Sequence, residues 1–131
     1  MSVEQHDVVR KRPVNLNLFT IKFPIPAIAS ILHRLSGLLL FIFIPFLLWA
    51  LQTSLDSAGS YQDLITYLTS PFAKFITWVF IIGLSYHLFA GIRHLIQDAG
   101  WGESLKVGRL TAMIVMILTL VVAIIMGIWL W

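Results

Sequence analysis

The sequence predicts an all-α integral membrane protein with three transmembrane helices. Of its 131 residues, 59% are hydrophobic and 11% are charged, whereas a soluble domain carries about 25% charged residues. Three stretches contain no charged residue, namely 35–55, 75–92 and 110–131, which are 21, 18 and 22 residues long. A helix of about 20 residues, rising about 1.5 Å per residue, crosses the roughly 30 Å hydrocarbon layer of a bilayer. We therefore expect most of the surface of this chain to contact lipid.

The three charge-free stretches divide the chain into an N-terminal arm and a membrane domain. We expect the arm to comprise residues 1–27 and the three-helix transmembrane domain to comprise residues 28–131. The helices need not coincide with the charge-free stretches, because a helix ends at capping or turn-forming residues. The helices are expected at about 28–52, 71–98 and 105–131.

The loop between the first two spans carries its own helix signals. Ser70 followed by Pro71 is typical of an N-cap residue with proline at the first helical position. Ser60 and Asp63 resemble a capping box. We therefore expect a short helix from Tyr61 to Thr69 at the membrane surface.

The distribution of Lys and Arg predicts the orientation of the chain. The first loop carries Asp56 and Asp63 and hardly any basic residue, whereas the arm and the second loop are basic. Under the positive-inside rule, the N-terminus is cytoplasmic and the C-terminus periplasmic. Acidic residues in the arm argue against a transit peptide, so a bacterial inner membrane is the expected location. Nucleic acid is not an expected partner, because the basic residues are few and lie at the ends of apolar runs: Arg10, Lys11, Arg12, Lys22, Arg34, Lys74, Arg93, Lys106 and Arg109.

A histidine inside the second span is the first candidate functional residue. His87 lies six residues, about 9 Å along a helix, from Arg93, and Gly83 and Gly91 flank it by one turn on either side. A haem needs a nitrogen ligand and a helix surface without side chains, which this spacing provides. The spacing is also compatible with a small-residue helix contact in which His87 only bonds a neighbouring helix. No second histidine shares its face and depth, so a second axial ligand would come from another chain.

A group of polar residues at the start of the first span is the second candidate. Ser30, His33 and Arg34 are expected at the same membrane depth as Arg93 and His94. Such groups could neutralise haem propionates or donate hydrogen bonds to a quinone carbonyl. Taken singly, the arginines could equally be interfacial anchors and the serine could bond its own backbone. The chain has no cysteine, so iron–sulfur and thiolate ligation within it are excluded.

These motifs resemble a known family. The chain is similar over nearly its whole length to the cytochrome b large membrane-anchor subunit of bacterial succinate dehydrogenase, the respiratory complex II. The third span is only generically similar, and the arm departs from the R-P-x-S-P-H-L of many members. The matching segments are Arg12-Pro13-Val14-Asn15-Leu16, Ser30-Ile31-Leu32-His33-Arg34 with Ser36-Gly37, and Tyr86-His87 with Gly91-Ile92-Arg93-His94-Leu95 and Asp98.

The resemblance implies roles for these residues. His87 is implied as an axial ligand of the iron of one haem b, with the other axial histidine supplied by a small membrane-anchor subunit. Ser30 and Arg34 are implied in a ubiquinone site, and His33, Arg34 and His94 near the haem propionates. The implied partners are that small subunit, an iron–sulfur subunit, a flavoprotein subunit and the bilayer. The chain would then form part of a multi-subunit helical bundle and pass electrons to ubiquinone, without acting on succinate itself.

Two other functions remain open at this stage. A fumarate reductase anchor would run the same electron transfer in reverse and oxidise menaquinol. A haem-free membrane scaffold subunit would use its histidine only to bridge helices. A small transporter is disfavoured, because three spans without an internal repeat offer little of a pathway.

Overall fold

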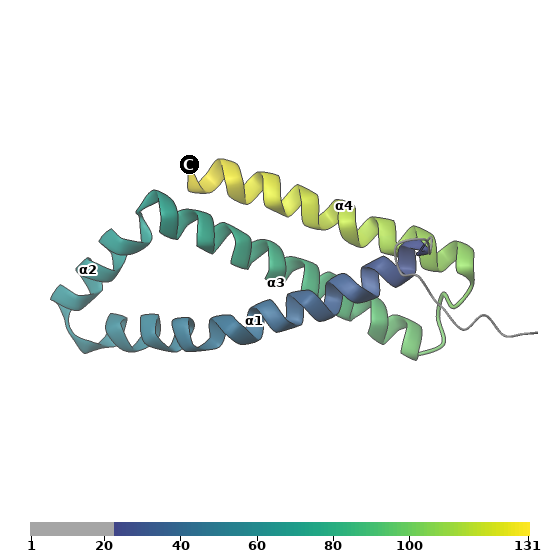
Figure 1. The fold of residues 1–131 in the computed structure, drawn as a ribbon, viewed down its shortest axis with the longest axis horizontal. Helices are drawn as coiled ribbons and strands as arrows, with labels where there is room; N and C mark the ends of the chain where they lie inside the picture. The colour runs from purple at the N-terminus through teal and green to yellow at the C-terminus, as the bar shows by residue number, and fades with distance from the viewer. Residues whose placement is uncertain (1–22) are drawn as a thin grey trace, which may run out of the picture.

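The predicted all-α membrane fold is confirmed. A computed structural model describes residues 23–131, and these form four helices without a strand (Figure 1). Three of the helices are long and apolar enough to cross a membrane. The arm residues Arg12 to Leu16 lie outside the described part of the chain. The helices are α1 (Ile25–Asp56), α2 (Ala58–Leu68), α3 (Pro71–Asp98) and α4 (Leu105–Leu130).

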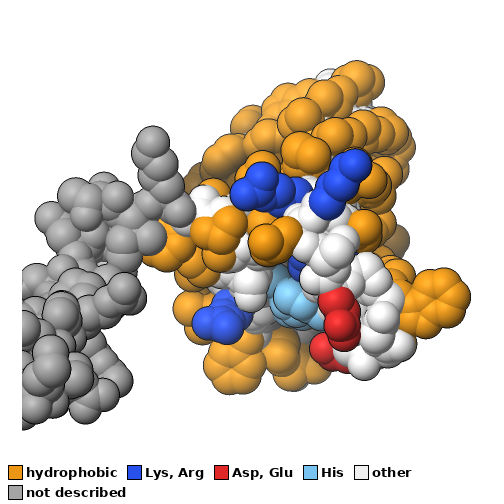
Figure 2. Space-filling model, turned by 90° about the vertical axis from the view of Figure 1, so that its right-hand side faces the viewer, with side chains coloured by type: hydrophobic (Ala, Val, Ile, Leu, Met, Phe, Trp, Pro, Cys, Tyr) orange, Lys and Arg blue, Asp and Glu red, His pale blue; other side chains and the backbone are white. Residues whose placement is uncertain are grey.

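The three long helices form an elongated bundle with α3 at its centre. Helix α1 crosses α3, α4 runs along the other side of α3, and α2 joins the far ends of α1 and α3 (Figure 1). We call the opposite end, where α1 and α4 begin and α3 ends, the basic end, because it carries Arg34, Arg93, Lys106 and Arg109. Figure 2 views this end and shows blue Lys and Arg side chains around pale blue histidine.

The helices pack through small side chains, and the large apolar side chains face outward. In lipid there is little hydrophobic drive to bring helices together, so close backbone approach and van der Waals contact stabilise the bundle instead. Leucine, isoleucine and phenylalanine side chains are mostly exposed on the isolated chain, as expected for a surface covered by acyl chains or by other membrane helices. The residues that α4 buries follow one helical stripe: Gly108, Ala112, Val115, Thr119 and Ala123.

The short helix α2 differs from the expectation at its start. The side chain of Ser57, and not that of Ser60, caps it, because Ser57 Oγ accepts a hydrogen bond from the backbone N–H of Ser60 at 3.1 Å. The helix therefore begins at Ala58, three residues before the expected Tyr61. Ser70 caps α3 in the same way and is followed by Pro71, as the sequence indicated.

Helix α1 is longer than expected at both ends. It begins at Ile25 instead of residue 28, because Pro24 is the N-cap residue and Pro26 lies in the first turn, where a missing N–H group costs nothing. It ends at Asp56 instead of residue 52, and only Ser57 separates it from α2. Ser30 therefore lies in the second turn of α1.

Trp78 supplies a hydrogen bond between α3 and α4 that can be tested. Its indole N–H donates to the backbone carbonyl of Ala123 at 2.8 Å. Trp78→Phe removes this donor, so we expect a loss of about 1 kcal/mol and a thermal midpoint of the purified complex a few degrees lower. Trp129→Phe is the matched control, because Trp129 is 76% exposed, and it should leave the midpoint unchanged. Equal midpoints for the two variants would contradict this role of Trp78.

Candidate functional site

The side chain of His87 is held between α3 and α1. It projects from near the middle of α3, slightly toward the basic end, and faces Gly37 of α1. A methyl group at position 37 would lie 3.0 Å from His87 Cε1, which is closer than a Cβ atom normally comes to another carbon. Glycine at position 37 therefore makes the room in which the imidazole ring lies.

Hydrogen bonds to α1 select one tautomer of His87. Its Nδ1 lies 3.2 Å from the backbone carbonyl of His33 and 3.1 Å from Ser36 Oγ. The Ser36 hydroxyl donates its own hydrogen to the same carbonyl at 2.8 Å, so both neighbours of Nδ1 act as acceptors. Nδ1 must then carry the hydrogen, which leaves the lone pair on Nε2. His87 Nε2 forms no hydrogen bond with any residue of 23–131, so this nitrogen is available to a ligand.

Three histidines form a row toward the basic end. The rings of His33 and His87 are stacked, with centroids 4.2 Å apart and an interplanar angle of 23°. His94 continues the row, with its ring centroid 5.1 Å from that of His33. The stack leaves no room for a planar group between His33 and His87, and imidazole lone pairs lie in the ring plane. His33 and His87 therefore cannot bind opposite faces of one haem.

The two glycines that flank His87 in the sequence contact α1. A methyl group at Gly83 would lie 2.6 Å from Leu39 Cδ2, and one at Gly91 would lie 3.6 Å from His33 Nε2. The expectation that these glycines leave a side-chain-free surface for a macrocycle is therefore wrong for the isolated chain. They allow α1 to approach α3, and the side chains of α1 fill the space that they leave.

The open side of His87 faces a groove between α1 and α3. The groove has a volume of about 340 Å³ and its lining is apolar apart from the imidazole. An apolar lining with one imidazole is the kind of surroundings that a haem requires, and Gly37 leaves the space that the ring occupies. No cluster of three or more metal-ligating side chains occurs within residues 23–131, and His87 is the one metal-ligating side chain among the residues that line the groove. The groove is lined by Gly37, Leu40, Phe41, Ile44, Leu47, Phe80, Leu84 and His87.

The structure separates the remaining predicted site residues into two groups. Ser30 is half-buried and Arg34 is exposed, and both lie on α1 within one turn of His33 at the basic end. Arg93 instead turns toward α4 and is only 7% exposed. Its guanidinium donates to Thr111 Oγ1 at 3.0 Å and to the carbonyl of Gly108 at 3.2 Å. Arg93 is therefore not part of the histidine row, although it lies at a similar depth in the membrane.

Two residues of the site were given no role by the sequence reasoning. Ser36 is 7% exposed and orients His87, and Tyr86 is 8% exposed and donates from its hydroxyl to the carbonyl of Ala29 at 2.9 Å. The signal for Ser36 was its position three residues after His33, one turn away on a helix. For Tyr86 the signal was a phenol in a membrane span, which needs a partner when it is buried.

The fold and the site together define a class of protein. It is a multi-pass helical membrane protein that presents one oriented imidazole in an apolar groove around the middle of its first two spans. The chain belongs to the succinate dehydrogenase/fumarate reductase transmembrane subunit family, whose sequence model matches residues 9–126.

Curated relatives agree with this assignment. The chain is 39% identical to the succinate dehydrogenase cytochrome b556 subunit of Coxiella burnetii, over 92% of this chain and 98% of the relative. It is 33% identical to the cytochrome b556 subunit of Rickettsia prowazekii, over 89% of this chain and 91% of the relative. The subunit of the same name from Paracoccus denitrificans is also 33% identical, over 72% of this chain and 73% of the relative. The resemblance seen in the motifs thus extends over most of the sequence.

The hydroxyl of Tyr86 should stabilise the crossing of α1 and α3. Tyr86→Phe leaves the carbonyl of Ala29 without this donor, so we expect a loss of about 1 kcal/mol, seen as a lower thermal midpoint of the purified complex. Tyr67→Phe removes a hydroxyl from a side chain that is 54% exposed and should change nothing. If Tyr86→Phe behaves like this control, the hydrogen bond does not contribute to packing.

Proposed function

We propose that this chain is the membrane-anchor cytochrome b subunit of a succinate dehydrogenase, and that it binds one haem b together with a small membrane-anchor subunit. The observation that carries the proposal is the state of His87. Its Nδ1 is held by α1, and its Nε2 is free at an apolar groove. The family and the names of the curated relatives support the same function.

His87 would be the one iron ligand that this chain contributes. Haem b, when bound, supplies one-electron transfer within the membrane. The hydrogen bond from Nδ1 to the His33 carbonyl fixes the orientation of the ring, as partners of metal-bound histidines generally do. Neither His33 nor His94 lines the groove, so the second axial histidine is assigned to the small subunit.

Ser30 and Arg34 would form the part of a ubiquinone site that this chain contributes. The exposed guanidinium of Arg34 can donate hydrogen bonds to a quinone oxygen and stabilise negative charge that develops there during reduction. Ser30 lies one turn earlier on α1 and can donate a further hydrogen bond. His33, Arg34 and His94, which lie at the basic end, would be near the haem propionates.

The basic end would dock the iron–sulfur subunit, which in turn carries the flavoprotein subunit where succinate is oxidised. This chain performs no chemistry on succinate and contributes to quinone reduction only. The concentration of Lys and Arg at this end supports a cytoplasmic side, with the C-terminus in the periplasm and the chain in a bacterial inner membrane. In this arrangement the arm, residues 1–27, lies on the cytoplasmic side of the three-helix domain, residues 28–131.

A fumarate reductase anchor is the second candidate, because the family description includes both enzymes. Such a subunit would oxidise menaquinol, and its complex would reduce fumarate faster than it oxidises succinate. The ratio of the two rates with ubiquinone and menaquinone analogues separates the candidates.

His87→Ala tests the proposed iron ligand. Removing the imidazole should abolish the b-type absorbance in reduced-minus-oxidised spectra of the purified complex. His33→Ala removes a ring stacked at 4.2 Å on His87 but no ligand, so its complex should retain the absorbance. A complex with an unchanged spectrum in His87→Ala would show that another residue binds the iron. A wild-type complex without a Soret band would favour the haem-free scaffold.

Arg34→Met tests the proposed quinone site. Loss of a charge-assisted hydrogen bond should lower kcat/KM for ubiquinone reduction by about tenfold or more. Succinate oxidation with a soluble dye should be unchanged, because the dye takes electrons before they reach the membrane subunit. Arg109→Met is the control, since it removes an exposed arginine of the basic end on α4. Equal quinone kinetics in both variants would remove Arg34 from the site.

A further inference from the structure

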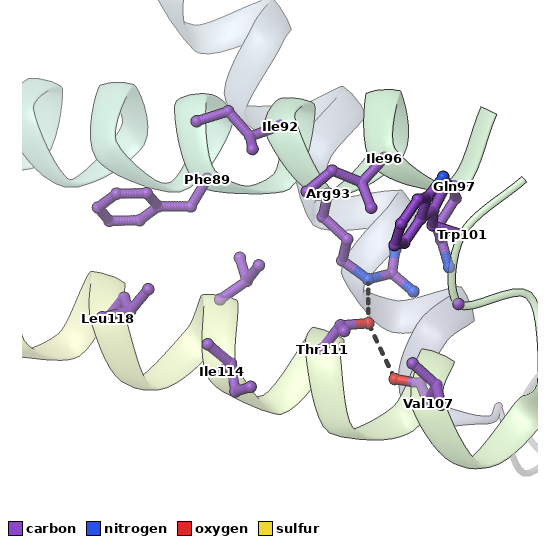
Figure 3. A pocket seen from close by; sticks show the side chains of 12 residues that line it. Phe89, Ile92, Arg93, Ile96, Gln97, Trp101, Val107, Thr111, Ile114 and Leu118 are labelled. Atoms are coloured by element: carbon purple, nitrogen blue, oxygen red, sulfur yellow. Dashed lines mark hydrogen bonds between the residues drawn. The ribbon is translucent and has the colours of Figure 1, made fainter. Parts of the chain in front are cut away.

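A second groove lies on the other side of α3, between α3 and α4, and no part of the proposed function uses it. Its volume is about 400 Å³. Figure 3 shows apolar side chains of the two helices facing one another across it, with Arg93 and Trp101 at one end. The apolar walls are formed by Phe89, Ile92 and Ile96 of α3 and by Ile114, Val115 and Leu118 of α4.

The end of this groove carries a positive charge that is not neutralised within the described chain. Arg93 is only 7% exposed, and its two hydrogen bonds go to neutral oxygens, those of Thr111 and Gly108 (Figure 3). No Asp or Glu between residues 23 and 131 forms an ion pair with it. A buried charge without a counter-ion is costly, so this site favours an anion.

The two properties together describe an amphiphile. An acyl chain matches the apolar walls, and an anionic headgroup at the end of the chain would meet Arg93. Trp101 is 74% exposed beside Arg93, and tryptophan is typical of the headgroup level of a bilayer. We propose that this groove binds one anionic phospholipid, with an acyl chain between α3 and α4 and its phosphate near Arg93.

A lipid fits these observations better than a helix of another subunit. The open side of the groove is bordered by Ile92, Ile114 and Leu118, which are 47%, 45% and 44% exposed, so the groove opens at the apolar surface of the chain. Helix interfaces in this chain use small residues, as on the buried stripe of α4, whereas large branched side chains border this groove. A basic site between transmembrane helices at the headgroup level is also a typical lipid site. The inference does not depend on haem or quinone binding.

The test measures lipid retained by the intact complex. Wild-type and variant complexes are reconstituted in nanodiscs of phosphatidylcholine with a minor fraction of phosphatidylglycerol, extracted in mild detergent, and analysed by native mass spectrometry. We expect one phosphatidylglycerol to remain on the wild-type complex in preference to phosphatidylcholine. Arg93→Met should reduce its retention by about fivefold, the effect of one basic residue at a membrane surface.

Two further variants keep the test decisive if Arg93→Met does not assemble. Ile114→Trp fills the groove without changing charge, and it should also lose the lipid. Arg109→Met removes an exposed charge on α4 outside the groove, and it should retain the lipid. The mass of each complex in the same spectra shows that all of its subunits are present, independently of lipid. Equal retention of the two lipids by the wild-type complex, or unchanged retention in Ile114→Trp, would overturn the proposal.

The rival occupant is tested with a single cysteine. Since the chain has no cysteine, Ile114→Cys introduces one thiol at the opening of the groove. Labelling by a lipid-soluble maleimide supports a lipid-facing groove. Crosslinking of this thiol to another subunit by a short bifunctional reagent would place a protein helix there and would overturn the proposal.

Discussion

The hydrogen bond between His87 and the carbonyl of His33 is the interaction on which the site depends. Without water in the membrane interior, an imidazole N–H needs a protein acceptor, and α1 supplies it through a backbone carbonyl that a helix already holds rigidly. The same contact joins α1 to α3 and leaves Nε2 free on a residue that lines the groove. Gly37 and Ser36 belong to this arrangement, since one leaves space for the ring and the other bonds its Nδ1 atom.

Helix α3 organises the bundle because its polar side chains point to both neighbours. Tyr86 and His87 bond to backbone carbonyls of α1, whereas Trp78 and Arg93 bond to α4. Each of these side chains donates a hydrogen bond across a helix interface that is otherwise made of small residues. The bundle is therefore held by a few directional contacts, and the apolar surface that remains is left for lipid and for partner subunits.

The sequence was sufficient for the membrane fold, and it singled out the three histidines that the structure brings together in one row, but it gave no role to Ser36 or Tyr86. Charge-free runs predict spans because the cost of burying charge in lipid is large and general. Charge-free runs do not predict which side of a helix contacts its neighbour, since this depends on the rotation of each helix about its own axis. Arg93 was grouped with His33 and His94 because the three residues lie at a similar depth in the membrane. Consecutive residues of a helix point in directions about 100° apart, however, and Arg93 points toward α4. For the same reason Gly83 and Gly91 were assigned to a cofactor, although they contact α1.

The rotation of Arg93 away from His94 has a chemical consequence for the whole subunit. One helix presents two polar sites on opposite faces, an imidazole in the groove with α1 and a guanidinium in the groove with α4. In the proposed arrangement the cation near the haem propionates would be Arg34 of α1, whereas Arg93 would face a lipid phosphate on the other side of α3. A haem held by His87 and a lipid held by Arg93 would therefore lie on different sides of α3, each beside its own polar side chain.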